Sequence, residues 1–250
     1  MAILTGVLAL VTVLLCIGIL LIAGALLFLV VRFANQWALL TLRRHAPTPI
    51  GQVAGRRRVA VEGRTEYGSA GRQVGPVSGQ DCTWYRLLLV REPSRAPGEG
   101  DGYDVLLDLS SPAWPALADP TGRIAVDPRM LDLPTRQEPL TTETVRLTEP
   151  ASMPPVVPRD VIADLRRGER LALSEVRLPR GREVFALGRP HDGGLVPSRG
   201  ALSVFTTDSR AKVLADRTED VKVALGAALV MLLTGVALTG GSAAALNYVG

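Results

Sequence analysis

The chain has 250 residues, of which 47% are hydrophobic, 21% charged and 4% aromatic, and its formal net charge is +4. Nearly all basic residues are arginines, and no aromatic residues alternate with them, so the composition argues against a nucleic-acid partner. Cys16 lies in an apolar segment and Cys82 far outside it, so we expect no disulfide between them. The fold must then be stabilised by its hydrophobic core.

The first apolar segment contains no charged residue from position 2 to position 31. As a helix it would be about 45 Å long, against about 30 Å for the hydrocarbon core of a bilayer. We therefore predict a transmembrane helix over residues 1–32. A cleavable signal peptide is the alternative, but it requires basic residues before its apolar run, and here the first is Arg32.

A helical extension of this span is predicted over residues 33–46. Phe33, Trp37 and Leu40 recur at i, i+4 and i+7, and Pro47 ends the pattern. This apolar stripe could lie on the membrane surface or pack on the following domain, and the sequence favours neither.

Residues 47–215 are predicted to form a β-rich, mostly antiparallel domain. Short apolar stretches of four to eight residues alternate with Gly/Pro turns such as DPTG at 119–122 and HDGG at 191–194. One short helix is expected over residues 158–168, with Gly168 as its C-cap. The proline-rich segment 127–158 is expected to join two β-rich halves as an extended connection.

A second transmembrane helix is predicted over residues 221–246, followed by a short tail at 247–250. A buried Ala/Gly-rich helix of a soluble domain is the alternative, although such a helix normally shows a polar face. Small residues could also make this helix a site of homo-oligomerisation. The residues on that face are Ala227, Met231, Gly235 and Thr239.

Basic residues lie beside the inner ends of both spans. They are Arg32, Arg43, Arg44, Arg56, Arg57 and Arg58 after the first, and Arg210, Lys212, Arg217 and Lys222 before the second. The positive-inside rule then predicts a two-pass protein of the cell membrane, with the central domain in the cytoplasm and both termini outside.

Few residues suit catalysis or metal binding. The two histidines, His45 and His191, match no zinc spacing, and no phosphate-binding glycine motif occurs, so neither a metal nor a cofactor is expected. Ser78 lacks the glycine that a nucleophile elbow requires. Cys82 remains as a candidate nucleophile, which would need a base such as His191, or as a buried structural residue.

Several short motifs follow one another in a characteristic order: VEG at 61–63, GPVSGQDCTWYR at 75–86, DPTGRIAV at 119–126, REVFALGRP at 182–190 and ALSVFTTDS at 201–209. Flanked by two apolar segments, this series resembles the GIDE family, whose β-rich "beside a membrane" domain also occurs in the mitochondrial ubiquitin ligase MULAN. The resemblance implies two transmembrane helices flanking an antiparallel β-rich domain. In the eukaryotic ligases a RING finger binds zinc and recruits the charged conjugating enzyme. No cysteine follows Cys82 here, so we expect no ligase activity.

The resemblance also implies structural roles for its motif residues. A cysteine after a Pro/Ser/Gly turn begins a strand, an aromatic neighbour packs inward, the arginine faces outward, and residues 87–90 fill the core. Glycines in the motifs take turn or close-packing positions, and Asp119 and Thr121 form a turn. The motif residues are Gly63, Pro76, Cys82, Trp84, Tyr85, Arg86, Asp119, Gly122 and Gly188.

These features together predict a non-enzymatic membrane module that holds its β domain against the lipid bilayer. There it would bind an unknown membrane or cytoplasmic protein or sense envelope stress. The alternative is a transferase or hydrolase that uses Cys82 as its nucleophile.

Overall fold

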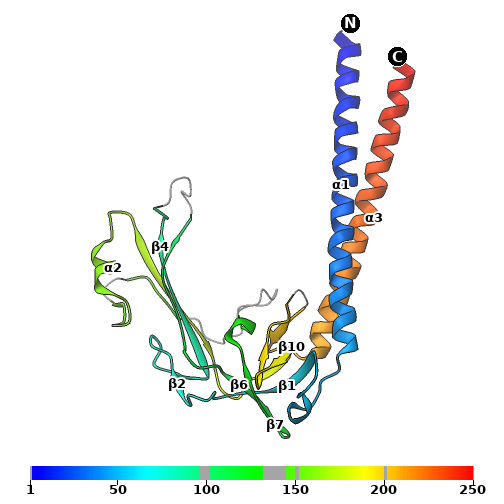
Figure 1. Cartoon of the computed structure of the whole chain (residues 1–250). Coiled ribbons are helices and arrows are strands. Elements are labelled where there is room, and N and C mark those ends of the chain that lie inside the picture. The colour runs from blue at the N-terminus through cyan, green and yellow to red at the C-terminus, as the bar shows by residue number, and fades with distance from the viewer. Residues whose placement is uncertain (1, 96–101, 132–144, 150–151, 200–201, 250) are drawn as a thin grey trace. The chain divides into compact units, whose positions relative to one another are not determined.

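The computed structural model describes residues 2–95, 102–131, 145–149, 152–199 and 202–249. Two long apolar helices at the ends of the chain flank a β-rich domain (Figure 1). The helices form one compact unit, and Ala46–Ser209 forms the other.

The helical unit pairs α1 (Ala2–Arg44) with α3 (Arg210–Val249), and the two chain ends lie at the same end of this hairpin (Figure 1). In the apolar part of α3 the buried residues 224, 228, 235 and 242 form one stripe, together with the partly buried residues 231 and 238. Their spacing alternates between four and three, which is the heptad repeat of helices that wind around each other. At Gly18, a Cβ would lie 2.9 Å from the carbonyl oxygen of Gly235, so the backbones meet where neither helix carries a side chain.

Polar contacts set the register of this pair at its charged end. The Arg217 guanidinium donates to Asn35 Oδ1 at 3.3 Å, and that of Arg210 donates to the Leu42 carbonyl at 3.0 Å. In this register the apolar segment of α1, which ends at Val31, and the apolar segment of α3, which begins at Val223, have their inner ends at about the same level.

The second helix is longer than the sequence predicted. It begins at Arg210 rather than near residue 221, and it continues through most of the expected tail to Val249. The first three turns of this helix carry charged residues. Because a transmembrane span is predicted from apolar residues alone, the prediction left these charged turns out. The expected domain end at residue 215 therefore falls inside α3.

The larger sheet of the β domain is a small barrel. Its strands run in the order β1-β6-β7-β11-β10, and the antiparallel pairing of β1 with β10 closes this row, while β12 adds to β10. Neighbours are antiparallel except β7 and β11. The bounds are β1 (Val59–Glu66), β6 (Ala116–Asp119), β7 (Gly122–Val126), β10 (Glu183–His191), β11 (Gly194–Val196) and β12 (Val204–Thr206).

A four-stranded sheet in the order β5-β4-β9-β8 and a small β2-β3 hairpin complete the strands. Their bounds are β2 (Gln73–Val74), β3 (Asp81–Cys82), β4 (Trp84–Glu92), β5 (Asp104–Ser110), β8 (Val145–Leu147) and β9 (Arg170–Leu178). Short helical turns lie at η1 (Ile50–Gln52) and η2 (Pro128–Met130), and the expected helix is α2 (Arg159–Ala163), shorter than predicted.

The two sheets do not correspond to halves of the sequence, contrary to the prediction for segment 127–158. Each sheet draws strands from both sides of that segment, because β1 closes on β10 and β4 pairs with β9 along its whole length. Part of the segment, residues 132–144 and 150–151, lies outside the described residues. Such long-range pairings leave no local sequence signal.

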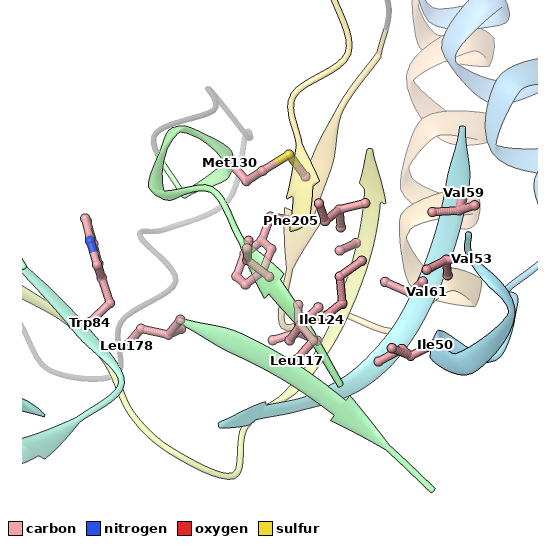
Figure 2. Packing of buried hydrophobic residues seen from close by; sticks show 14 residues of the cluster. Ile50, Val53, Val59, Val61, Trp84, Leu117, Ile124, Met130, Leu178 and Phe205 are labelled. Carbon is pink, nitrogen blue, oxygen red and sulfur yellow. The ribbon is translucent and has the colours of Figure 1, made fainter. Parts of the chain in front are cut away.

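The barrel interior holds the main hydrophobic core (Figure 2). Strands β1, β6, β7, β10 and β12 supply most of it, and Ile50 and Met130 of the two short turns close it. Trp84 and Leu178, which pair across β4 and β9, join the same core from the other sheet. A second cluster, centred on Leu87, packs that sheet against α2 and its neighbours. The two sheets thus share one core at Trp84.

Candidate functional site

Cys82, the candidate nucleophile, lies at the end of β3 and is fully buried. Burial raises the pKa of its thiol to about 11, and the charged groups that act on it are Arg177, Glu175 and Asp81. A thiol in this environment stays protonated at neutral pH, which is the opposite of an activated cysteine.

The GPVSGQ turn that precedes Cys82 is built around a buried carboxylate. Glu175 of β9 is 0% exposed and accepts from the Val77 N–H at 2.6 Å and from the Ser78 hydroxyl at 2.5 Å. Arg177 Nε lies 3.3 Å from the same carboxylate. At Gly75 a Cβ would lie 2.6 Å from Glu175 Oε1, so only glycine fits there, while Pro76 lies in the turn itself. Ser78 is therefore bound to a buried carboxylate of the turn rather than to a histidine.

The residues after Cys82 divide between the two cores. Thr83 separates β3 from β4, and both its N–H and its hydroxyl donate to the Leu178 carbonyl at 2.8 Å. Trp84 packs into the barrel core, Tyr85 packs on the second cluster, and Arg86 pairs with Asp108 at the surface. Cys82 thus belongs to a two-residue strand of its own, and β4 begins only after Thr83.

Asp119 organises the turn between β6 and β7. Its Oδ1 accepts from the N–H groups of Thr121 and Gly122, and its Oδ2 accepts from the Ile50 N–H at 2.8 Å. Burial alone would raise the pKa of Asp119, but these donors outweigh it and lower the pKa below its ordinary value. This turn fastens η1 onto the barrel.

The glycines of the family motifs lie at close backbone approaches. A Cβ at Gly63 would lie 2.8 Å from the Ala118 carbonyl oxygen, and one at Gly188 would lie 2.9 Å from the Val196 carbonyl oxygen. At Gly122 it would lie 3.3 Å from the backbone nitrogen of Gly51. These positions pack strands and turns together.

The two histidines lie apart from Cys82 in the topology. His191 ends β10, and its Nε2 lies 3.2 Å from the exposed Asp192 carboxylate. His45 follows α1, and its ring bonds to the Thr41 carbonyl. Across the described residues, no group of three or more histidine, cysteine, aspartate or glutamate side chains could hold a metal ion.

An open groove of about 920 Å³ lies on the barrel. Gly63, Val184 and Phe185 contribute backbone and apolar surface to it, and a single arginine, Arg64, pairs across the strands with Glu183 at 3.0 Å. The groove has five carboxylates, on Glu62, Glu66, Asp119, Glu183 and Asp208. Glu183 is paired with Arg64, Glu66 is paired with Arg180 at 2.7 Å, and Asp119 accepts from backbone N–H groups, but acidic side chains still outnumber the basic ones there. The groove therefore suits a basic or mixed basic and apolar ligand.

The sequence did not single out this groove, apart from Gly63 and Asp119. Its residues come from β1, the β6–β7 turn, β10 and the segment after β12, which the barrel closure brings together. Within β1, the alternation of Glu62, Arg64 and Glu66 indicates one solvated face, and nothing in it predicts which other carboxylates lie nearby.

An ion-pair network joins the β4–β5 hairpin to the start of β9. Arg95 bonds to Asp164 at 2.7 Å and to Glu169 at 2.6 Å, while Arg91 pairs with Asp104. Donation by the Ser94 hydroxyl, the Arg95 N–H and Arg91 lowers the pKa of Asp104 to about 2, and donation by Arg95 and a backbone N–H lowers that of Glu169 to about 2. These groups stabilise the turns.

Comparisons of the chain with family profiles, with curated proteins and with solved structures find no match. The site must therefore be interpreted from its own residues.

Proposed function

We propose that this chain is a two-pass membrane protein that presents a small β-barrel domain beside the bilayer and binds a protein partner there. The single observation that carries the proposal is the apolar surface of the helix pair. The most apolar 18-residue windows of Leu8–Arg44 and Arg210–Asn247 have mean hydropathies of 3.1 and 2.2, and both helices are long and apolar enough to cross a membrane. Only 11% and 17% of their most apolar windows are buried.

This exposure distinguishes the pair from the core helix of a soluble protein, which would be mostly buried. Large apolar side chains such as Leu20, Leu27 and Leu233 are 64–70% exposed, and contiguous apolar surface of this extent requires a lipid or protein environment. The packing of Gly18 against Gly235 favours a retained anchor over a cleaved signal, because α1 is half of a helix pair.

For topology, the positive-inside rule supports a cytoplasmic central domain and termini on the outer side of the cell membrane. Phe33, Trp37 and Leu40 are 58%, 72% and 48% exposed and follow directly on the apolar run, which supports their place at the lipid interface. Reporter fusions at each terminus test this: an alkaline phosphatase active at both ends is expected, and activity of a cytoplasmic reporter there would contradict it.

Membrane insertion itself is tested by alkaline carbonate extraction. The chain should stay in the pellet, and release into the supernatant would refute the anchor. A variant with Leu20→Arg and Leu233→Arg should lose this retention, whereas Trp37→Arg, at the proposed interface, should keep it.

The partner site that we propose is the acidic groove. Its five carboxylates outnumber Arg64 and the neighbouring Arg180, which pairs with Glu66, and together with the apolar lining they favour a partner segment with basic and apolar side chains. Co-purification from membranes should return a specific partner that is lost with Glu62→Lys and Glu183→Lys together. Glu149→Lys together with Asp160→Lys makes the same total charge change at exposed residues outside the groove and should retain the partner.

We also propose that the chain is related to the GIDE family. In support, the motif residues 75–86 form the β2–β3 turn, β3 and the start of β4, residues 119–126 form the β6–β7 turn and β7, and residues 182–190 form most of β10. An experimental structure of a GIDE-family domain should show a strand equivalent to β1 pairing with one equivalent to β10. A different strand order would exclude the relationship.

A further inference from the structure

The whole net charge of the chain lies in the helical unit. Of the 28 basic and 24 acidic residues, seven and three belong to this unit, residues 1–45 and 210–250, so the β domain contains 21 of each. All ten charged residues of the helical unit lie within residues 32–44 and 210–222, between the apolar segments and the β domain. The net charge of +4 is therefore concentrated beside the apolar segments.

The register of the helix pair places these charges at one level. The two polar contacts that set the register, at Asn35 and at the Leu42 carbonyl, bring the charged stretch of α3 alongside that of α1. The exposed stripe of Phe33, Trp37 and Leu40 lies in the same stretch of α1. The charges are therefore at the level that we assign to the lipid interface, where anionic headgroups attract basic side chains.

A groove of about 690 Å³ opens on the helical unit at this level. Its wall is an apolar stretch of α3 that includes Leu214 and Ala215, and its positive charge comes from Arg43 of α1 and Lys222 of α3. Glu219 is the one acidic residue among those that line it. The groove thus combines a net positive charge with an apolar wall, which suits an amphipathic anion.

Arg43 and Lys222 enter the groove from opposite ends. Helical side chains lean towards the N-terminus of their own helix. Because α1 and α3 are antiparallel, Arg43 leans towards the apolar segments and Lys222 leans away from them, along the groove that both residues line. Neither side chain forms a hydrogen bond or an ion pair with another residue that the structure describes, whereas Arg210 and Arg217 hold the two helices together.

We propose that this groove binds the headgroup of an anionic phospholipid, whose phosphate is attracted by Arg43 and Lys222. The occupant is a lipid rather than a soluble anion because Lys222 directly precedes Val223, where the apolar segment begins. Acyl chains of a lipid held there continue along the exposed apolar surface of α3, on which Val223 and Val230 are 62% and 65% exposed. The inference rests on the proposed membrane anchoring and adds the class of lipid that the helix pair selects.

The test measures which lipids the full chain retains from nanodiscs of phosphatidylcholine and phosphatidylglycerol in equal amounts. Native mass spectrometry counts the lipids that stay on the released protein. The wild type should retain phosphatidylglycerol in excess over phosphatidylcholine. In Arg43→Gln/Lys222→Gln that excess should fall about tenfold or more, because each basic residue at an anionic surface strengthens binding by about fivefold.

The matched control is Arg44→Gln/Lys212→Gln, which removes one arginine and one lysine from exposed positions of the same charged stretches, outside the groove. It should keep most of the phosphatidylglycerol excess. A second variant, Glu219→Gln, removes the carboxylate from the groove and should raise the excess. Arg43→Gln/Lys222→Gln should unfold at the wild-type midpoint in phosphatidylcholine alone, because both side chains are exposed.

Two results would overturn the lipid site while leaving the membrane anchor intact. The first is a wild-type chain that enters the nanodiscs and retains the two lipids equally. The second is an equal loss in Arg44→Gln/Lys212→Gln, because the attraction would then come from the overall charge of the helix ends and not from the groove. A chain that fails to enter nanodiscs of phosphatidylcholine alone would instead overturn membrane anchoring, and the lipid site with it.

Discussion

The carboxylate of Glu175 provides the sharpest test of how the GPVSGQ turn is held. Glu175→Ala removes the acceptor of the Val77 N–H and the Ser78 hydroxyl, and it leaves Arg177, whose side chain is 3% exposed, without its buried carboxylate. Breaking one side of a buried ion pair costs about 3–5 kcal/mol, and the lost charged hydrogen bonds act in the same direction. Since a domain is stable by about 5–15 kcal/mol, this single change should remove a large part of that stability.

The assay is urea unfolding of the full chain in zwitterionic micelles, followed by the fluorescence of Trp84, which is buried beside the turn. Trp37→Phe and Trp114→Phe in the background leave that indole as the only reporter. The matched control is Asp108→Ala, which breaks an ion pair with Arg86 in which the two side chains are 34% and 44% exposed. Surface pairs are worth about 0–1 kcal/mol, so the control should change the midpoint only slightly.

A double-mutant cycle then isolates the contact with the turn. Glu175→Ala and Ser78→Ala should show a coupling energy of about 1–2 kcal/mol, within the range of contacting residues. If Glu175→Ala costs no more than the surface control, or if the coupling is near zero, the buried carboxylate does not organise the turn and the structural interpretation of the motif fails.

Three further results are expected. In a variant lacking the other cysteine, the Cys82 thiol should resist a maleimide probe in native protein and react after denaturation. The reason is that a pKa raised from 9.0 to about 11 leaves about 100-fold less thiolate at neutral pH. Rapid labelling of the native protein would instead support a nucleophilic role. Gly18→Leu should lower the midpoint of thermal unfolding of the helix pair in micelles. Gly226→Leu should not, because no atom lies within 4 Å of its added Cβ. Equal effects of the two changes would contradict the close approach of Gly18 to Gly235. Because Asp104 and Glu169 have folded pKa values of about 2, below their unfolded values, their contribution is complete above about pH 4.5 and is lost as the pH falls towards 2. The protection of amides near the β4–β5 hairpin, measured relative to their intrinsic exchange rates at each pH, should fall in that window, and unchanged protection would exclude the network as a stabilising element.

Local patterns in the sequence were sufficient for the kinds of element and for their order. The uncharged run that ends at Val31 gives α1, alternation in residues 58–63 gives β1, and the HDGG turn appears as a tight hairpin in which Asp192 and Gly193 both have positive φ. Each of these signals lies within ten or so residues, the distance over which periodicity and turn chemistry act.

Features that depend on distant residues could not be predicted in this way. Nothing near Glu175 shows that its partners lie about a hundred positions earlier, and nothing near Val59 indicates that it pairs with Gly188. The face of α3 considered for self-association is used within the chain, since Gly235 meets Gly18. A small-residue stripe predicts close helix packing but not which helix is packed against it.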